Sequence, residues 1–395
     1  MQNSLKKIKI LNVVTGVYDG GLEMLIYRIY KGLDKSRYEL NLCVLVMAEE
    51  SFLMSNFRGI CDNIYNLNFK NKNVKITGHI KNSVEMLKLV FLMNRNNFDI
   101  IHCHEYFPAT ITRIALIVLR IFTYKKPKKV YTTNHSILYF LKPIHHKINK
   151  VLSRITDRII CVSKTVAEFI IETEHIDENK LLVIHNGLNP DDFFFDDEIR
   201  KSEREKYGFK EQDIVLGNVG VLSVTKGQIY ILEAINKLKK TYPDLKLLIV
   251  GTSRNHEYHI GQELRKYIRD NNLSEIVKII NTTNDINRIY NIFDIFIMSS
   301  IAEGFGLTAF EAILAGNIGV FSDIDTFKEL SLNGKYGLLF ENKNSESLSN
   351  VLEDIIKNKK KYESLKKDAR EYVVNNFSLD LMVSEYENLY NINSK

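Results

Sequence analysis

The sequence predicts an α/β protein built from two domains. Short apolar runs such as residues 8–14 alternate with segments such as 22–33, in which apolar residues recur at helical spacing. A polar stretch at 189–208 interrupts this alternation, which begins again at 214–219. Strands that alternate with helices form sheets with helices packed on their faces. At 395 residues, the chain is long enough for two such domains, each with its own core.

Composition and charge exclude several classes of protein. The chain is 45% hydrophobic and 26% charged, which is typical of a soluble globular protein. Its net charge of +6 is modest, and we expect no nucleic-acid partner. Lys6, Lys7 and Lys9 lead directly into a strand-like run, a pattern that does not fit a signal peptide. The four cysteines contain no C-x-x-C pair and are expected to be reduced core residues of an intracellular protein: Cys43, Cys61, Cys103 and Cys161.

One stretch, DIFIMSSIAEGFGLTAFEAILAG at residues 294–316, has the pattern of a ligand-binding turn. The apolar run at 295–298 predicts a buried strand, and residues 307–314 have helical periodicity. Gly304 and Gly306 lie in the turn between them, where glycine lets the backbone approach a ligand closely. The free N–H groups and positive dipole end at the start of the next helix suit a phosphate.

Two glutamates flank this turn. Glu303 lies in the loop and Glu311 lies one to two turns into the helix, so both carboxylates could face one crevice. Ionised carboxylates only accept hydrogen bonds, which suits sugar hydroxyls. A phosphate with hydroxyls on either side describes a nucleotide sugar. The same spacing also fits an ordinary strand–turn–helix whose glutamates are solvated, and spacing alone leaves both interpretations open.

The stretch resembles the E-x7-E signature of the retaining glycosyltransferases of family four. The resemblance rests on the run Glu303, Gly304, Phe305, Gly306 and on Glu311 eight residues after Glu303, and it extends over nearly the whole chain. Members of this family have the GT-B fold, in which two Rossmann-like domains face each other across a cleft. The resemblance implies four parts: an N-terminal acceptor domain at 1–188, a linker at 189–208, a nucleotide-sugar domain at 209–376, and a C-terminal helix at 377–395 that returns to the first domain.

The resemblance also implies a role for each residue of the donor site. Glu311 would bind the ribose hydroxyls, and Glu303 would bind a hydroxyl of the transferred sugar. Thr282 lies in the loop that reads the nucleobase through backbone groups in relatives. The diphosphate would be held by the following residues: Gly21, Lys226, Gly304, Phe305, Gly306 and Leu307.

One position departs from the family pattern. Relatives hold the diphosphate with an arginine and a lysine, and this chain has Lys226 but carries Val221 where the arginine is expected. Loss of a charge-assisted hydrogen bond to phosphate weakens the stabilisation of the leaving group by roughly 1.5–3 kcal/mol. Arg254 is a candidate replacement, and a partner chain is the alternative source of the missing function.

Three histidines follow or end predicted strands. His102 and His104 occur in DIIHCHE, but no third ligand is spaced to complete a metal site with them. In the family, the histidine at the position of His135 lies beside the transferred sugar, and some members need it for activity. The resemblance therefore makes His135 a candidate catalytic residue together with Glu303 and Lys226. A hydrogen-bonded histidine at the end of a strand is the alternative.

Basic residues cluster in the first half of the chain. Residues 106–156 contain ten Lys or Arg and no Asp or Glu. Within them, LYFLKPIHHKINKVLSRI at 138–155 mixes cations with aromatic and aliphatic residues, as a membrane-surface patch does. Each cation near an anionic lipid surface contributes about 1 kcal/mol. Similar enzymes commonly contact the membrane through this domain, and a solvated helix face is the alternative.

The resemblance implies a retaining hexosyl- or N-acetylhexosaminyltransferase that moves a sugar from a nucleotide-sugar donor to a glycan or lipid-linked acceptor. We expect it to act in surface polysaccharide or glycolipid assembly, in the cytoplasm or peripherally on the inner face of the membrane. No D-x-D motif with suitable surroundings occurs, so we expect no metal and no cofactor besides the nucleotide-sugar co-substrate. Val221 leaves open a non-catalytic GT-B accessory subunit that binds a glycan or a protein partner. A sugar-nucleotide epimerase is a third alternative.

Overall fold

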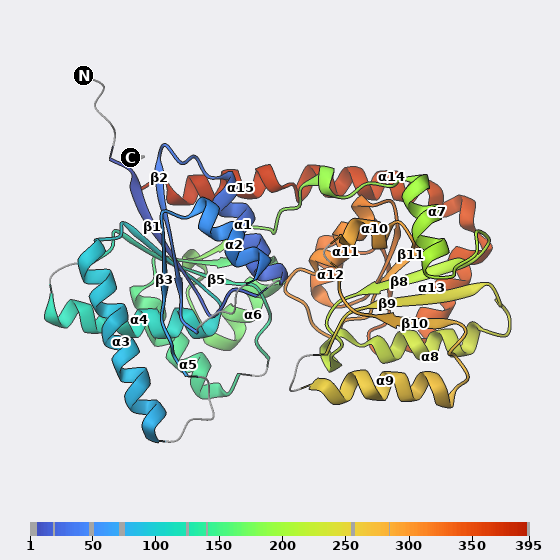
Figure 1. Ribbon diagram of the computed structural model, residues 1–395, viewed down its shortest axis with the longest axis horizontal. Helices are drawn as coiled ribbons and strands as arrows, with labels where there is room; N and C mark the ends of the chain where they lie inside the picture. Colours follow the sequence, from blue (N-terminus) through green and yellow to red (C-terminus); the bar gives the residue numbers. More distant parts are fainter. Residues whose placement is uncertain are drawn as a thin grey trace. The chain divides into compact units, whose positions relative to one another are not determined.

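The structure is a computed structural model that describes residues 6–18, 20–46, 51–70, 76–123, 126–139, 141–253, 257–283 and 285–392, with the backbone alone for 76–81. Contacts divide the chain into two units, Met1–Gly187 with Leu379–Lys395, and Leu188–Ser378. Each unit contains a parallel sheet with helices on both faces (Figure 1).

The strands of the first unit form one sheet in the order β3-β2-β1-β4-β5-β6-β7. Neighbouring strands pair parallel, with Ile10 of β1 opposite Leu40 of β2 and Ile100 of β4. The strands are β1 (Ile8–Val14), β2 (Tyr38–Val44), β3 (Asn63–Asn66), β4 (Ile100–His104), β5 (Lys129–Asn134), β6 (Arg158–Cys161) and β7 (Leu181–Val183).

Helices cover both faces of this sheet because successive strand residues point to opposite sides. Ile10 and Val14 of β1 pack in one core, on the face of α1, α2 and α15, while Leu11 and Val13 pack in the other, on the face of α3 and α4. The helices are α1 (Gly21–Gly32), α2 (Phe52–Ile60), α3 (Ile76–Asn96), α4 (Tyr106–Phe122), α5 (Pro143–Leu152), α6 (Lys164–Glu174) and α15 (Leu379–Tyr390).

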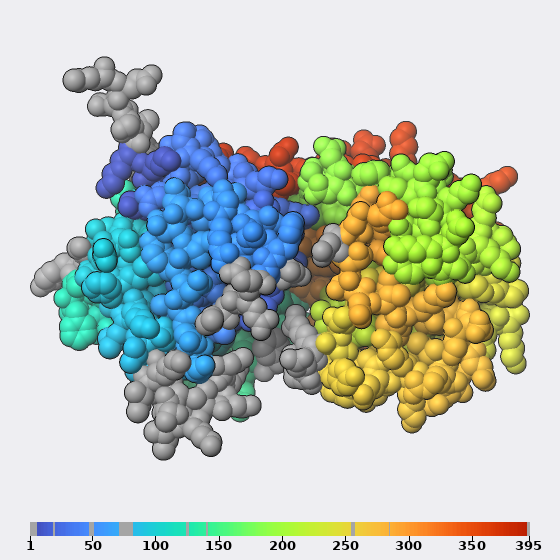
Figure 2. Space-filling model, in the orientation of Figure 1, coloured from blue at the N-terminus to red at the C-terminus, as the bar shows by residue number. Residues whose placement is uncertain are grey.

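The last helix, α15, completes the core of the first unit. Met382, Tyr386 and Tyr390 are buried among residues of β1, β2 and α1. The Tyr131 hydroxyl of β5 donates to the Leu389 carbonyl at 3.0 Å. Figure 2 accordingly shows red atoms from the end of the chain beside blue atoms from its beginning.

The second unit repeats the architecture with the strand order β10-β9-β8-β11-β12-β13. Strands β8 and β9 pair parallel over their whole length, from Ile214 opposite Leu245 to Val219 opposite Val250. The strands are β8 (Ile214–Val219), β9 (Leu245–Val250), β10 (Val277–Ile280), β11 (Ile295–Met298), β12 (Ile318–Ser322) and β13 (Leu338–Phe340).

Two groups of helices enclose this second sheet. Helices α8, α9 and α13 pack on one core, which is mainly aliphatic. Figure 1 shows α8 and α9 on one side of the sheet, and α10, α11 and α12 on the other. The helices are α7 (Asp197–Lys206), α8 (Gln228–Leu238), α9 (Tyr258–Asp270), α10 (Ile286–Tyr290), α11 (Leu307–Leu314), α12 (Asp325–Leu330), α13 (Ser345–Lys357) and α14 (Lys359–Asn376).

The segment 189–208, predicted to be a linker, folds against the second sheet. Arg200 and Arg204 of α7 donate to the two carboxylate oxygens of Asp294, at 2.6 Å and 2.7 Å. Asp294 also accepts from the Val215 N–H at 2.8 Å, and it immediately precedes β11. This ion-pair cluster therefore fixes the start of the two central strands, β8 and β11.

Both sheets have a position where the strand order reverses, between β1 and β4 and between β8 and β11. Loops that leave the carboxyl ends of parallel strands diverge at such a position and leave a crevice, where ligands of α/β proteins bind. The prediction of two Rossmann-like domains is confirmed, and each has a crevice position of this kind.

Candidate functional site

In the second unit, the structure brings together Lys226 and Glu303, which follow the two central strands. The Lys226 ammonium donates to Oε1 of Glu303. Their side chains are 25% and 12% exposed, so water screens this pair less than it screens an ordinary surface pair. The pair lies at the carboxyl ends of β8 and β11, where the strand order reverses.

Backbone contacts between the two loops hold Lys226 in place. A 3-10 turn, Val224–Lys226, ends at Gly227, whose φ of +62° lies in the left-handed region. A Cβ at Gly227 would lie 2.2 Å from the Ser299 carbonyl oxygen, so only glycine allows the loops to approach this closely. The Ser299 hydroxyl donates to the Lys226 carbonyl at 2.9 Å, and the Ile301 N–H donates to the Thr225 carbonyl at 2.8 Å.

Hydroxyl groups fix Glu303 on the other side. The Ser300 hydroxyl donates to Glu303 Oε1 at 2.7 Å, and the Thr326 hydroxyl donates to the Glu303 carbonyl at 2.7 Å. Oε1 of Glu303 therefore accepts from both an ammonium and a hydroxyl. This carboxylate is preorganised, which is what a residue that orients a substrate hydroxyl requires.

The residues 304–307 form the start of α11. Gly306 caps the helix with a φ of +83°, and a Cβ there would lie 2.8 Å from the Phe327 ring. Phe305 is buried, with its ring 5.3 Å from that of Phe377, so its side chain belongs to the core. Gly304 is also buried, and Leu307 is the first residue of the helix. The groups in this segment that suit a phosphate are backbone N–H groups.

Glu311 lies in α11 and contacts a buried tyrosine of α10. The Tyr290 hydroxyl donates to Glu311 Oε2 at 2.7 Å. Burial and the adjacent Glu311 carboxylate raise the pKa of Tyr290, which keeps its hydroxyl protonated and able to donate. Tyr290 thus orients a carboxylate that the sequence placed near the crevice.

Three further residues of this unit were considered for the donor site: Thr282, Val221 and Arg254. Thr282 is exposed after β10, the edge strand, two strands away from β8. Val221 is partly exposed, and its carbonyl accepts from the Gln228 side chain at 3.0 Å. Arg254, the candidate replacement for the missing arginine, lies outside the described residues.

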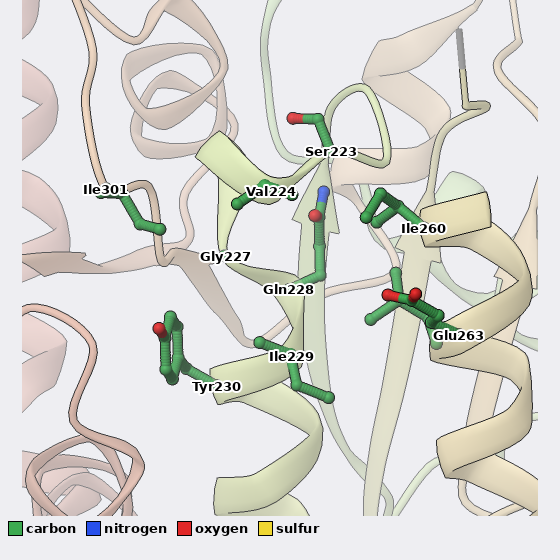
Figure 3. A pocket seen from close by; sticks show the side chains of 10 residues that line it. Ser223, Val224, Gly227, Gln228, Ile229, Tyr230, Ile260, Glu263 and Ile301 are labelled. Carbon is green, nitrogen blue, oxygen red and sulfur yellow. The ribbon is translucent and has the colours of Figure 1, made fainter. Parts of the chain in front are cut away.

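A small cavity of about 170 Å³ adjoins the Lys226 loop (Figure 3). Its walls are mainly apolar and come from the beginnings of α8 and α9, with Val224, Ile260 and Ile301 among them. Typical small-molecule sites enclose about 300–1,000 Å³, so this cavity alone is too small for a nucleotide sugar. We therefore do not assign the donor to it.

In the first unit, His102 and His104 lie on the same face of β4 and are buried. His102 hydrogen-bonds through Nδ1 to the Tyr390 hydroxyl at 2.6 Å and through Nε2 to the Thr133 hydroxyl at 2.7 Å. His104 hydrogen-bonds through Nε2 to Asn12 Oδ1 at 3.0 Å. Both imidazoles therefore bind protein groups, and within the described residues no three His, Cys, Asp or Glu side chains gather as a metal site would require.

His135, the candidate catalytic histidine, follows β5 and stacks on His104. Its Nε2 lies 3.1 Å from Nδ1 of His104, and the ring centroids are 5.4 Å apart. Burial lowers the pKa of His135 to about 3, and burial with the neighbouring histidines lowers the pKa of His104. Both rings are therefore neutral at neutral pH.

Glu105 is a residue that the sequence did not single out. It follows His104, and its φ of +70° and ψ of 168° are unusual for a residue with a side chain. Its carboxylate accepts from the His135 N–H at 3.2 Å and from the Ser136 hydroxyl at 3.4 Å. Burial raises the pKa of Glu105 to about 7, although these hydrogen bonds act in the opposite direction. The sequence feature that could have identified Glu105 is its position at the end of DIIHCHE, directly after a predicted strand.

Gly21 is the first residue of α1, after the loop that leaves β1. It is exposed, and Gly20 precedes it as the cap residue without a side-chain hydrogen bond. The helix start therefore presents backbone N–H groups at the same sheet edge as His135 and Glu105.

Only part of the basic stretch 106–156 is exposed at the surface. Arg113 is 1% exposed and donates to the Ala109 carbonyl at 2.9 Å and to Asn149. It is therefore a core residue, which corrects its inclusion in a membrane-facing patch. Lys128 and Lys129 pair with Asp99 and Asp157.

The rest of the stretch presents apolar side chains and cations together. On α4, Ile121 and Phe122 are 72% and 78% exposed. On α5, the apolar residues Ile144, Ile148 and Val151 are exposed beside the exposed cations Lys147 and Lys150. Among the described residues, no helix has both the length and the apolar character needed to cross a bilayer.

Comparison with known proteins identifies the family. The family model described as "Glycosyltransferase Family 4" matches residues 19–192, and the model described as "Glycosyl transferases group 1" matches residues 199–372. Together the two models match most of both units.

Relatives are similar over almost the full chain. A UDP-Gal:alpha-D-GlcNAc-diphosphoundecaprenol alpha-1,3-galactosyltransferase of Escherichia coli is 24% identical over 99% of this chain and 98% of its own. The capsular polysaccharide biosynthesis glycosyltransferase CapM of Staphylococcus aureus is 23% identical over 78% of this chain and 80% of its own. The solved structure of HepE from Anabaena in complex with UDP and glucose covers 98% of this chain and 100% of its own, with 19% identity and a TM-score of 0.85. The chain therefore belongs to the glycosyltransferases of family four and has their GT-B fold.

Proposed function

We propose that this glycosyltransferase moves a hexosyl or N-acetylhexosaminyl group, with retention of the anomeric configuration and without a metal ion, from a nucleotide sugar to a glycan or lipid-linked acceptor. The main support is the Lys226–Glu303 pair at the position in the second sheet where the strand order reverses. The printed names of relatives, which include a galactosyltransferase for a diphosphoundecaprenol-linked sugar and a capsular polysaccharide enzyme, support surface polysaccharide or glycolipid assembly.

In this proposal, the residues of the second unit hold the donor. The Lys226 ammonium and the N–H groups of residues 304–307 stabilise the leaving diphosphate. Such electrostatic stabilisation is usually the largest contribution to catalysis. Glu303 orients a hydroxyl of the sugar, Glu311 binds the ribose, and Thr282 lies in the loop that contacts the nucleobase. His135 binds the transferred sugar.

A donor screen tests this proposal. The purified full chain is incubated with a panel of nucleotide sugars, including UDP-galactose and UDP-glucose, with an undecaprenyl-diphosphate-linked GlcNAc acceptor, and products are detected by mass spectrometry. We expect turnover of one donor, its loss in Glu303→Ala, and an NMR coupling in the product that shows the donor's anomeric configuration. A product with the opposite configuration would contradict retention.

Val221 supports a second candidate, a non-catalytic accessory subunit that binds a glycan or a protein partner. Because Val221 replaces the expected arginine, Lys226 is the cation that remains in the loop after β8. Lys226 is already paired with Glu303. Absence of donor binding at every concentration would favour this candidate. Conversion of the donor without an acceptor would instead indicate an epimerase.

We further propose that the enzyme works in the cytoplasm, bound peripherally to the inner face of the membrane through α4 and α5. Exposed aliphatic residues beside cations are what an interfacial helix presents to anionic lipid. Cosedimentation with vesicles of phosphatidylglycerol and phosphatidylcholine at low salt tests this, and its absence would leave α4 and α5 as a solvated surface.

A further inference from the structure

A continuous chain of hydrogen bonds leads from β2 of the first sheet to His135. It begins at the backbone carbonyl of Asn41 in β2, which can only accept. The Tyr30 hydroxyl of α1 donates to this carbonyl at 2.8 Å. The direction of the first bond is therefore fixed by chemistry and not by the choice of a rotamer.

The Tyr30 oxygen then fixes the orientation of Asn12 in β1. Because its proton points to Asn41, the Tyr30 oxygen presents lone pairs to Asn12, whose backbone N–H donates to it at 3.2 Å. The Asn12 side chain also hydrogen-bonds to the Tyr30 oxygen. Only the Nδ2 amide group of Asn12 can donate there, so Oδ1 is the atom left to face His104.

The orientation of Asn12 determines the tautomers of both histidines. Asn12 Oδ1 accepts from Nε2 of His104 at 3.0 Å, so the proton of His104 is on Nε2 and its Nδ1 has a lone pair. Nε2 of His135 lies 3.1 Å from Nδ1 of His104 and must donate to its lone pair. A neutral imidazole has one proton, so Nδ1 of His135 then has a lone pair. Asn12 and His104 are 1% exposed, so water does not compete for these bonds.

We propose that Tyr30, Asn12 and His104 are positioning residues that hold His135 in its Nε2–H tautomer, so that Nδ1 of His135 accepts a hydrogen bond from a ligand hydroxyl. Among the described residues of the first unit, no hydrogen bond to Nδ1 of His135 is present. A lone pair attracts an O–H group and repels the oxygens of a phosphate or carboxylate. His135 therefore selects a hydroxyl, which is a sugar hydroxyl if the proposed function holds, and it does not contribute to binding the diphosphate.

Nitrogen-15 NMR of the histidine-labelled full chain tests the assignment without any ligand. The His135 signals are identified by their loss in His135→Gln. At neutral pH we expect an unprotonated Nδ1 and a protonated Nε2 for His135 in the unmodified chain. A protonated Nδ1 on His135 would overturn the proposal.

Tyr30→Phe tests the positioning role, because it changes a residue at the opposite end of this series of hydrogen bonds from His135. Without the hydroxyl, the Asn12 amide can rotate, and we expect the Nδ1 signal of His135 to shift toward the protonated form as the second tautomer is populated. Tyr38→Phe is the matched control, because Tyr38 is a buried tyrosine of the same core whose hydroxyl lies outside this hydrogen-bond chain. A tautomer that is unchanged in folded Tyr30→Phe would refute the role of Tyr30 and Asn12. The readout is independent of donor turnover, so a normal tautomer in a chain without turnover would contradict only the proposed function.

Discussion

Lys226 donates to the carboxylate of Glu303 across 77 residues of sequence, and this ion pair joins the loops that follow the two central strands of the second sheet. The ammonium has three N–H groups, so an entering diphosphate can bind it while Glu303 is held by Ser300. The ion pair therefore prepares both residues for a ligand that contains phosphate and hydroxyl groups.

Replacement of Lys226 should reduce turnover more than it reduces stability. In Lys226→Gln, the developing charge on the leaving diphosphate loses its ammonium, and we expect kcat to fall by roughly 100-fold to 1,000-fold. Release of nucleoside diphosphate from the donor measures this. Lys328→Gln is the control, since Lys328 is a residue of α12 in the same unit whose side chain is 43% exposed. Equal turnover in Lys226→Gln and the unmodified chain would remove Lys226 from the proposed site.

Gly306→Ala should destabilise the protein because the new Cβ would lie 2.8 Å from the Phe327 ring at a φ of +83°. We expect the free energy of unfolding to fall by about 2 kcal/mol, since the left-handed conformation alone costs about 1–2 kcal/mol per residue with a side chain. Urea unfolding measures the change. In Gly59→Ala the Cβ meets no atom within 4 Å, and this helical position should gain up to about 1 kcal/mol. If both variants were equally stable, the backbone of the α11 cap would not need glycine.

Glu105→Gln should stabilise the protein in a pH-dependent way. Burial raises the pKa of Glu105 to about 7 in the folded state, above its value in the unfolded chain. The carboxyl therefore favours folding below the unfolded pKa of about 4.3, and this contribution is lost as the pH rises through the folded value. At about pH 8 the glutamine variant should be more stable by about 3–4 kcal/mol, and the difference should shrink toward about pH 4.

Denaturant unfolding at several pH values measures this difference. Glu168→Gln in α6 is a suitable control because Glu168 is exposed. A stability difference for Glu105→Gln that does not change with pH would show that this carboxyl titrates normally.

Asp294→Asn should destabilise the second unit. Although burial acts in the opposite direction, Arg200 and Arg204 lower the pKa of Asp294. Its ionised form therefore stabilises the fold above the unfolded pKa of about 3.9, and this stabilisation is lost as the pH falls through the folded value. Near neutral pH we expect a loss of about 3 kcal/mol, because two arginines lose the charge of their partner. Thermal or urea unfolding measures it, with the exposed Asp325→Asn as a control that should change stability little. A loss of the same size at about pH 2 would contradict an electrostatic origin.

Ile121→Gln combined with Val151→Gln should weaken binding to anionic vesicles. Both side chains are exposed, and burying a large aliphatic side chain contributes about 1.5–3 kcal/mol, so we expect at least roughly tenfold weaker binding. Vesicle cosedimentation measures this. Phe52→Gln in α2 is the control, since Phe52 is 66% exposed but α2 covers the opposite face of the sheet. Equal losses in both variants would indicate non-specific adsorption.

Local patterns predicted most of the fold. Apolar runs predicted β1, β8 and β11, and the glycines of the EGFG turn correctly indicated the start of α11. Such features depend on neighbouring residues, which the sequence shows directly. The segment at 189–208 was harder to interpret because its helix, α7, has little apolar character and is held by Arg200 and Arg204 on Asp294.

The candidate site was predicted less completely, because it also depends on contacts between residues that are distant in the sequence. The sequence indicated Lys226 and Glu303 individually, and the resemblance to a family connected them. Glu105 and the hydrogen bonds from Tyr30 to His135 depend on the register of β1, β2 and β4, which brings distant residues together. His102 and His104 show the limit well, because a spacing that resembles a pair of metal ligands proved to be two buried imidazoles bound to Tyr390 and Asn12.

The place of α15 has a consequence for biosynthesis. Because residues 379–395 belong with residues 1–187, a ribosome must finish the intervening segment before the first sheet receives its last covering helix. Until then, the nascent chain lacks the part of this core that Met382, Tyr386 and Tyr390 fill, and His102 lacks its hydrogen bond to the Tyr390 hydroxyl. The second unit contains all of its own residues before α15 is translated, whereas the first unit does not. A stop codon shortly before residue 379 would therefore destabilise the first unit, although most of it is translated first.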